Sequence, residues 1–125
     1  MQTRVKITAK NVVVEAEFSD TACAKAILER LPLEASPNEW GDEFYFEVPV
    51  RSPLDKTATR TVKIGDIGYW PPGNALAIFF GPTPLSRGND PVPAGEVNLV
   101  GKIQGDAVSL RKAKGVSTIR LEKVL

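Results

Sequence analysis

Short segments in which apolar and polar residues alternate, separated by glycine and proline, make up most of this chain. The segment EFYFEVPV, residues 43–50, is the clearest example, because its phenylalanines and valines occupy every second position. Side chains at every second position of a β-strand point to the same face of its sheet, so this period of two predicts a strand with one buried face. The pattern restricts the chain to a mainly β fold.

The same alternation predicts eight strands. The first two are joined by a tight turn at Lys10 and Asn11. Pro49 lacks an amide donor, so the strand that contains it is expected to end at a sheet edge or a bulge. The predicted strands span residues 4–8, 12–18, 43–50, 61–64, 67–70, 75–80, 97–103 and 116–124.

Two segments favour helices. Ser19 or Asp20 is suited to cap a long helix whose apolar residues recur at helical spacing until Pro32 ends it. A shorter helix is predicted near residues 106–112. Many short strands with one long and one short helix indicate a β-barrel or a β-sandwich rather than an α/β sheet.

The composition excludes several classes of protein. The 125 residues fit a single domain, 1–125, and carry 16 basic against 15 acidic residues, a balance that gives no reason to expect nucleic acid or a membrane surface as a partner. The chain has no histidine, which excludes imidazole ligands and histidine-dependent nucleophiles. It also lacks the common nucleotide-binding and metal-binding motifs, so we predict no cofactor.

The single cysteine bears on the compartment. Cys23 has no second cysteine to pair with, and we expect it to be a buried apolar residue. The N-terminal residues are interrupted by charges, and no run of about 20 apolar residues occurs. These features predict a cytoplasmic protein.

Residues 81–96, GPTPLSRGNDPVPAGE, form the longest segment without a strand or helix pattern. Four prolines and three glycines in sixteen positions make it too long for a hairpin turn and too stiff for a flexible linker. We predict a surface loop of defined shape. Both a binding role and a simple connecting role are consistent with such a loop.

The aromatic segment GDIGYWPPGNALAIFFGPTP, residues 65–84, has two interpretations. Clustered aromatic rings beside glycine and proline suit a groove that binds an apolar or proline-containing ligand. Alternatively, the rings belong to the core. Strand alternation places Tyr69 and Trp70 on opposite faces and directs at least one of Phe79 and Phe80 inward.

The order of these elements resembles a cyclophilin-type β-barrel. It is most similar to a small prokaryotic cyclophilin-like family whose biochemical function is unassigned, with GDIGYWPPG, FFGPTP and VNLVGKI as the matching motifs. The resemblance implies a closed eight-stranded barrel with helices at its ends and a groove on the outer face, where true cyclophilins bind prolyl peptides.

The resemblance does not extend to the residues of prolyl isomerisation. Cyclophilin-type isomerases are similar to one another in a motif FHRIIPGFMxQGG, whose arginine stabilises the twisted amide. The corresponding strand here is FYFEVPV, in which Glu47 stands at the place of the arginine, and RSPLDKT replaces QGG. An ionised carboxylate only accepts hydrogen bonds, so it does not supply the donors that the reaction needs.

These observations predict a domain that binds an extended, proline-containing peptide or a small apolar ligand in an aromatic groove. Two alternatives remain open: a divergent prolyl isomerase that uses Arg51 or Arg60, and an assembly role through an exposed sheet edge. No oligomeric state is predicted. In the leading hypothesis the wall of the groove consists of Tyr45, Tyr69, Trp70 and one of Phe79 and Phe80, and the polar contacts come from Glu47 and Asn74.

Overall fold

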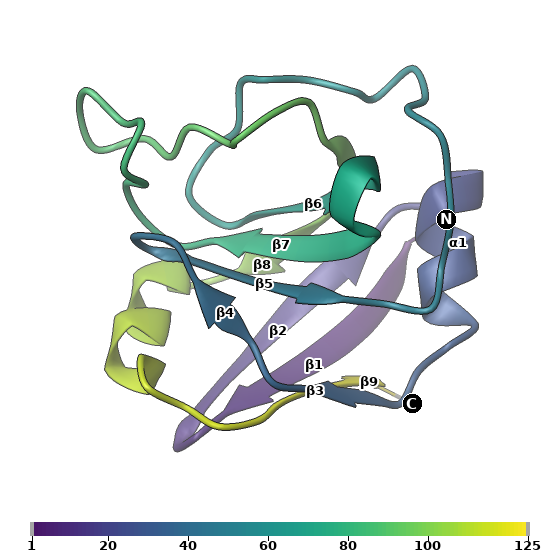
Figure 1. Cartoon of the computed structure of the whole chain (residues 1–125). Coiled ribbons are helices and arrows are strands. Elements are labelled where there is room, and N and C mark those ends of the chain that lie inside the picture. Colours follow the sequence, from purple (N-terminus) through teal and green to yellow (C-terminus); the bar gives the residue numbers. More distant parts are fainter. Residues whose placement is uncertain (1, 125) are drawn as a thin grey trace.

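The computed structural model describes residues 2–124, which form one strongly curled antiparallel sheet of nine strands in the order β3-β9-β1-β2-β8-β6-β7-β5-β4 (Figure 1). The strands are β1 (Thr3–Ala9), β2 (Val12–Phe18), β3 (Leu33–Ala35), β4 (Asn38–Glu39), β5 (Glu43–Glu47), β6 (Asp66–Trp70), β7 (Ala75–Phe79), β8 (Asn98–Gln104) and β9 (Ile119–Lys123). The helical segments are α1 (Ala22–Leu28) and two 3₁₀ helices, η1 (Pro71–Gly73) and η2 (Ala107–Ala113).

The mainly β fold is confirmed, but the prediction of a closed eight-stranded barrel is wrong. The sheet is a curled half-barrel whose edge strands are β3 and β4, separated along the chain by residues 36–37. Each edge strand is very short: β3 pairs only with β9, and β4 pairs only with β5. No ladder joins β3 to β4, so the sheet stays open between them.

Most predicted strands are present, with differences at their ends. The strand predicted over 43–50 ends at Glu47, before Pro49, and the strand predicted over 116–124 begins only at Ile119. Residues 61–64 are not a strand, and the nearest pairing to the sheet is a single bridge from Thr59 to Val97. The short strands β3 and β4 were not predicted.

The first helix is shorter than its pattern predicted. Thr21, rather than Ser19 or Asp20, caps α1 by accepting a hydrogen bond from the Ala24 amide at 3.2 Å. The helix ends at Leu28 after seven residues, because the chain tightens into i→i+3 hydrogen bonds before Pro32. The predicted second helix is present as η2, and α1 and η2 lie at opposite ends of the curled sheet (Figure 1). None of the helices within residues 2–124 has the length and apolar character needed to span a membrane.

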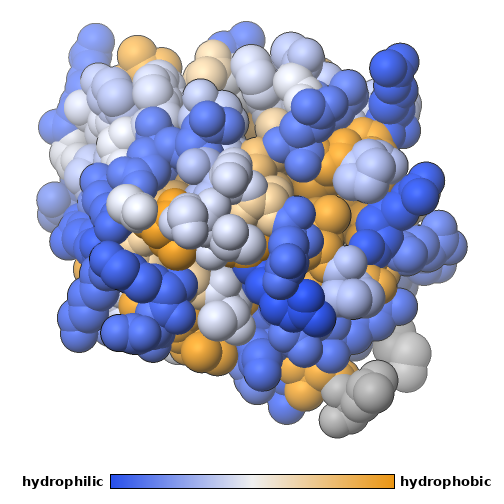
Figure 2. Space-filling model, turned by 60° about the horizontal axis from the view of Figure 1, so that its bottom comes forward, coloured by the Kyte–Doolittle hydropathy of each residue, from blue (hydrophilic) through white to orange (hydrophobic). Residues whose placement is uncertain are grey.

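The main core fills the concave side of the sheet. Alternation along β1 and β2 directs Val5, Ile7, Ala16 and Phe18 inward, as the sequence predicted. Cys23 is buried among them, as expected, and polar residues of the same strands face outward. On the face seen in Figure 2, hydrophilic residues predominate and apolar surface appears in separate areas between them.

A second, smaller cluster lies on the convex side of the sheet, over β6 and β7. It consists of Val62, Ala77, Phe79 and Val97, with Tyr45, Trp70 and Leu99 packed against it. All five residues of β7 are buried, so this strand has apolar contacts on both faces. The coil segments before β6 and after β7, which pass above these strands in Figure 1, supply Val62 and Val97 to this cover.

Asn98, the first residue of β8, holds the coil segment before β6 against the sheet through two hydrogen bonds. Its side chain is fully buried, its Nδ2 donates to the Pro53 carbonyl at 2.9 Å, and its Oδ1 accepts from the Asp55 amide at 2.8 Å. The side-chain amide of Asn98 thus supplies one donor and one acceptor to backbone groups of a segment that has no strand partner.

Replacing Asn98 by alanine removes both hydrogen bonds and leaves the two backbone groups without partners. We expect the Asn98→Ala variant to lose roughly 1–3 kcal/mol of unfolding free energy in urea titrations. Val13→Ala, at an exposed site on β2, is the matched control and is expected to change stability by less than about 0.5 kcal/mol. Equal stability of Asn98→Ala and the control would contradict the anchoring role.

Candidate functional site

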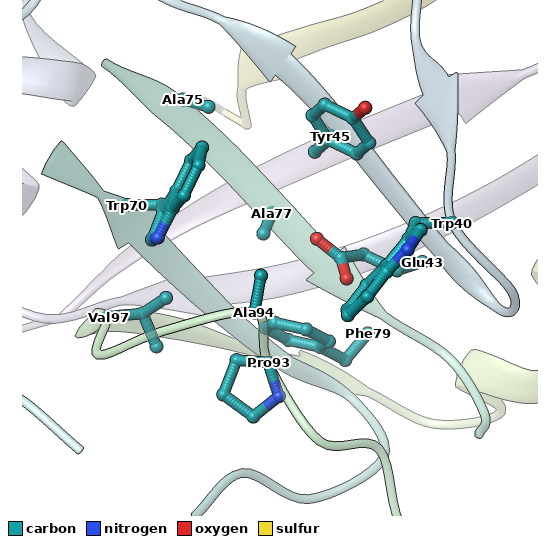
Figure 3. Close-up of a pocket in the computed structure, with 10 residues that line it drawn as sticks. All are labelled: Trp40, Glu43, Tyr45, Trp70, Ala75, Ala77, Phe79, Pro93, Ala94 and Val97. Atoms are coloured by element: carbon teal, nitrogen blue, oxygen red, sulfur yellow. The ribbon is translucent and has the colours of Figure 1, made fainter. Parts of the chain in front are cut away.

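A pocket of about 230 Å³ opens on the convex side of β5, β6 and β7, which we call the outer pocket (Figure 3). Four aromatic side chains and one carboxyl surround it, and no lysine or arginine is among its lining residues. The lining residues are Trp40, Glu43, Tyr45, Trp70, Ala75, Ala77, Phe79, Pro93, Ala94 and Val97.

The floor of the outer pocket is β7. Its outward-facing residues Ala75 and Ala77 are small, which leaves room above the strand, whereas Phe79 closes one end. Cross-strand register places Tyr45 of β5 beside Ala77 and Trp70 of β6 beside Ala75. Rings from the two neighbouring strands therefore flank the space above the alanines.

Two tryptophans occupy different sides of the pocket and are placed by glycines. Trp70 packs against η1, where a Cβ on Gly73 would lie 2.9 Å from its ring. Trp40 precedes Gly41, whose φ of 62° is in the left-handed region and whose close approach to Pro82 leaves no space for a side chain. The tight turn that results, with the Trp40 amide donating to the Glu43 carbonyl at 3.0 Å, brings Trp40 over the sheet.

The third side of the pocket is the loop 81–96, which has the defined shape that its prolines predicted. The Thr83 hydroxyl donates to the Val92 carbonyl at 2.6 Å and accepts from the Val92 amide at 3.3 Å. The Ser86 hydroxyl donates to the Asp90 carbonyl at 2.8 Å. These bonds cross the loop and hold Pro93 and Ala94 over the pocket.

Glu43 is the unusual residue of the site. Its side chain points toward the middle of the pocket, the residue is only 7% exposed, and Oε1 has no hydrogen-bond partner within the described chain (Figure 3). Burial disfavours the charged form and raises the pKa of the Glu43 carboxyl to about 8. A buried carboxyl without a partner costs free energy, so its position calls for a functional explanation.

The carboxylate of the preceding residue, Asp42, has a structural role and is fully paired. Asp42 forms ion pairs with Arg111 at 2.6 Å and with Lys114 at 2.7 Å. Burial opposes its ionisation, but the hydrogen bonds from Lys114 and Arg111 outweigh it and hold the pKa of Asp42 below its usual value. Asp42 thus ties the β4–β5 turn to η2, whereas the Glu43 carboxyl is left to the pocket.

The structure brings together three of the predicted ligand-binding residues, Tyr45, Trp70 and Phe79, at the outer pocket. Glu47 lies on the same face of β5 but is exposed and outside the lining. Four of the predicted residues therefore lie on the outer face of the sheet, and three of them line the pocket.

The remaining predicted residues, Tyr69, Asn74 and Phe80, are not among those that line the outer pocket. Tyr69 is buried in the main core, with its hydroxyl donating to the Val50 carbonyl at 2.6 Å and 3.2 Å from Asn74 Oδ1. Phe80 packs against Phe44 with ring centroids 4.8 Å apart.

Sequence reasoning missed Trp40, Glu43 and the loop residues Pro93 and Ala94. The signal for Glu43 was present, because the alternation in 43–50 places it on the same face as Tyr45. No periodic pattern indicated that Trp40 or the loop would cover that face. Within residues 2–124, no group of three or more histidine, cysteine, aspartate or glutamate side chains could hold a metal ion.

Comparison with known proteins agrees with this fold. A model of the Cyclophilin-like family matches residues 3–122, so the chain belongs to this family. It is also similar to the solution structure of the hypothetical protein AF2241 from Archaeoglobus fulgidus, with 30% sequence identity, a TM-score of 0.81, and coverage of 98% of this chain and 95% of that one. A comparison with curated proteins found no match.

The buried carboxyl predicts a pH-dependent stability. Since the folded pKa of Glu43, about 8, lies above the ordinary 4.5, the folded state holds this proton more tightly than the unfolded chain does. The resulting stability is complete below about pH 4.5 and is lost as the pH rises through about 8.

The Glu43→Gln variant does not ionise and avoids this loss. We expect its unfolding free energy relative to wild type to increase by about 4 kcal/mol between about pH 4.5 and pH 9, measured by urea unfolding. Glu47→Gln, at an exposed position of the same strand, is the control and is expected to follow wild type. Parallel pH profiles for wild type and Glu43→Gln would contradict the burial of an unpartnered carboxyl.

Proposed function

We propose that this cyclophilin-like domain binds a small, largely apolar molecule, or one apolar side chain of an extended peptide, in the outer pocket. The observation that carries the proposal is the enclosure of about 230 Å³ by four aromatic residues on three neighbouring strands and an adjoining loop. Apolar pockets with a few polar groups are the usual form of small-ligand sites.

The size of the pocket limits the ligand. Typical sites for drug-sized ligands have volumes of about 300–1,000 Å³, so a pocket of about 230 Å³ suits a compact group such as a single ring. A proline ring falls within this range, and a longer peptide would have to continue outside the pocket. The proposal therefore retains a proline-containing peptide as one source of the bound group.

Binding without isomerisation is the activity best supported by the surroundings. Rotation about a prolyl amide has a barrier of about 18–20 kcal/mol, and its catalysis needs donors directed at the amide. The lining residues include no lysine or arginine, and both Arg51 and Arg60 are exposed residues outside the lining. The pocket offers a carboxyl in their place.

Ligand titration of wild type and of a variant with a smaller pocket tests the proposal. In wild type we expect cyclohexanol and N-acetyl-proline methylamide to produce saturable changes in tryptophan emission, because Trp40 and Trp70 line the pocket. Ala77→Leu adds three carbons above the floor and is expected to weaken binding at least about tenfold, since cores and pockets do not absorb such volume without displacement. Far-UV circular dichroism checks that the variant remains folded.

Val13→Leu, on the exposed side of β2, is the matched control and is expected to bind like wild type. Unchanged affinity in Ala77→Leu would assign binding to another site. A complete lack of response in wild type up to the solubility limit of both probes would contradict the proposed function.

A further inference from the structure

The outer pocket surrounds one buried carboxyl with aromatic rings. We propose that its ligand carries an organic ammonium group, held by the Glu43 carboxylate and by the rings of Trp40, Tyr45 and Trp70. The inference rests on the proposed function, that the outer pocket binds a ligand, and adds the chemical class of that ligand.

The arrangement of the side chains provides the first argument. In Figure 3 the rings of Trp40 and Trp70 lie on either side of Ala77, Tyr45 lies at the rim, and the Glu43 carboxyl points into the space between them. Aromatic faces carry negative electrostatic potential and attract cations, and several rings around one space are the arrangement by which proteins bind quaternary ammonium groups. A carboxylate within the same space adds a full negative charge.

The charges around Glu43 provide the second argument. Of the elements that line the pocket, β6 contributes Trp70, and β7 contributes two alanines and Phe79. The loop 81–96 contributes a proline and an alanine, and Val97 follows the loop. Tyr45 of β5 is the only other titratable residue in the lining. The lining contains no lysine or arginine to offset the charge of an ionised Glu43. The cations beside the neighbouring Asp42, Arg111 and Lys114, are both paired with the Asp42 carboxylate.

The missing partner of Glu43 provides the third argument. Its Oε1 is buried without a hydrogen bond in the described chain, although the same strand could carry an apolar residue there at lower cost. A bound ammonium group places a positive charge beside the carboxylate, which the protein itself does not supply. A purely apolar ligand would leave the carboxyl unsatisfied, and an anion would meet only negative potential.

A neutral ligand with a carbonyl group is the main competitor. It would accept a hydrogen bond from protonated Glu43, but its oxygen would face aromatic rings of like electrostatic sign. The affinities of an ammonium ligand and of a carbonyl ligand depend on pH in opposite directions. An ammonium group requires ionised Glu43 and binds more tightly as the pH rises through about 8, whereas a carbonyl requires the protonated form and binds more weakly.

Two probes of nearly equal size and shape test whether the positive charge of the ligand contributes to binding. Choline carries a quaternary ammonium that does not titrate, and 3,3-dimethylbutan-1-ol replaces its nitrogen by carbon. We expect wild type at about pH 9 to bind choline at least about tenfold more tightly than the alcohol, and choline affinity to fall at least about tenfold between about pH 9 and about pH 6. Isothermal titration calorimetry and tryptophan emission measure both.

Glu43→Gln keeps the shape of the side chain and removes its charge. Because the attraction between opposite charges is lost, we expect it to lose at least about tenfold in choline affinity at about pH 9. It is expected to bind the alcohol as wild type does, which also shows that the pocket is intact. Equal affinities of wild type for choline and the alcohol, or unchanged choline binding in Glu43→Gln, would overturn the ammonium inference and leave the proposed function standing. Failure of both probes to bind would overturn both proposals.

A further arm identifies the source of the ammonium group, which is either a free small molecule or a modified lysine side chain. A short glycine-flanked peptide with trimethyllysine is titrated beside choline and beside the same peptide with norleucine. Tighter binding of the trimethyllysine peptide than of choline supports a side-chain source, and the reverse supports a free molecule. Equal affinity for the trimethyllysine and norleucine peptides would count against recognition of the ammonium group.

Discussion

The fold and the site depend on strand β7, which is buried on both faces. Its inward residues Leu76 and Ile78 belong to the main core, and its outward residues Ala77 and Phe79 belong to the smaller cluster on the convex side. A sheet with only one covered face would leave these outward residues in water. The coil segments on either side of β6 and β7 supply the second cover, and the outer pocket is the place where that cover does not meet the small side chains of β7.

Asp42 and Glu43, neighbouring residues at the start of β5, have opposite electrostatic surroundings. Asp42 has two cations within hydrogen-bond distance, and its charge helps to hold the β4–β5 turn against η2. Glu43, the next residue, has a buried oxygen without a partner and faces rings and alanines. Asp42 lies in the turn and Glu43 begins β5, so this short stretch serves both the stability of the fold and the chemistry of the pocket. The interaction with a bound cationic ligand would offset the unfavourable free energy of burying the Glu43 carboxyl.

The sequence predicted the features that follow from local periodicity. Alternation correctly separated Tyr69 from Trp70 and Phe79 from Phe80, and it placed Glu43 on the face of Tyr45. It did not predict which outward face would be covered, because the contacts of Trp40 and of Pro93 with that face join segments far apart in the chain. The open sheet likewise depends on how distant segments pair, such as β3 with β9, and no single segment reveals this.

The protonation of Glu43 is the property on which the account of the site depends. Carbon-13 NMR of the Glu43 side-chain carboxyl, assigned by comparison with Glu43→Gln, measures it directly as a function of pH. The account predicts a pKa of about 8 in the free protein and a clear decrease when choline is added at saturating concentration. A pKa near the ordinary 4.5 in the free protein, with no change on addition of choline, would contradict it.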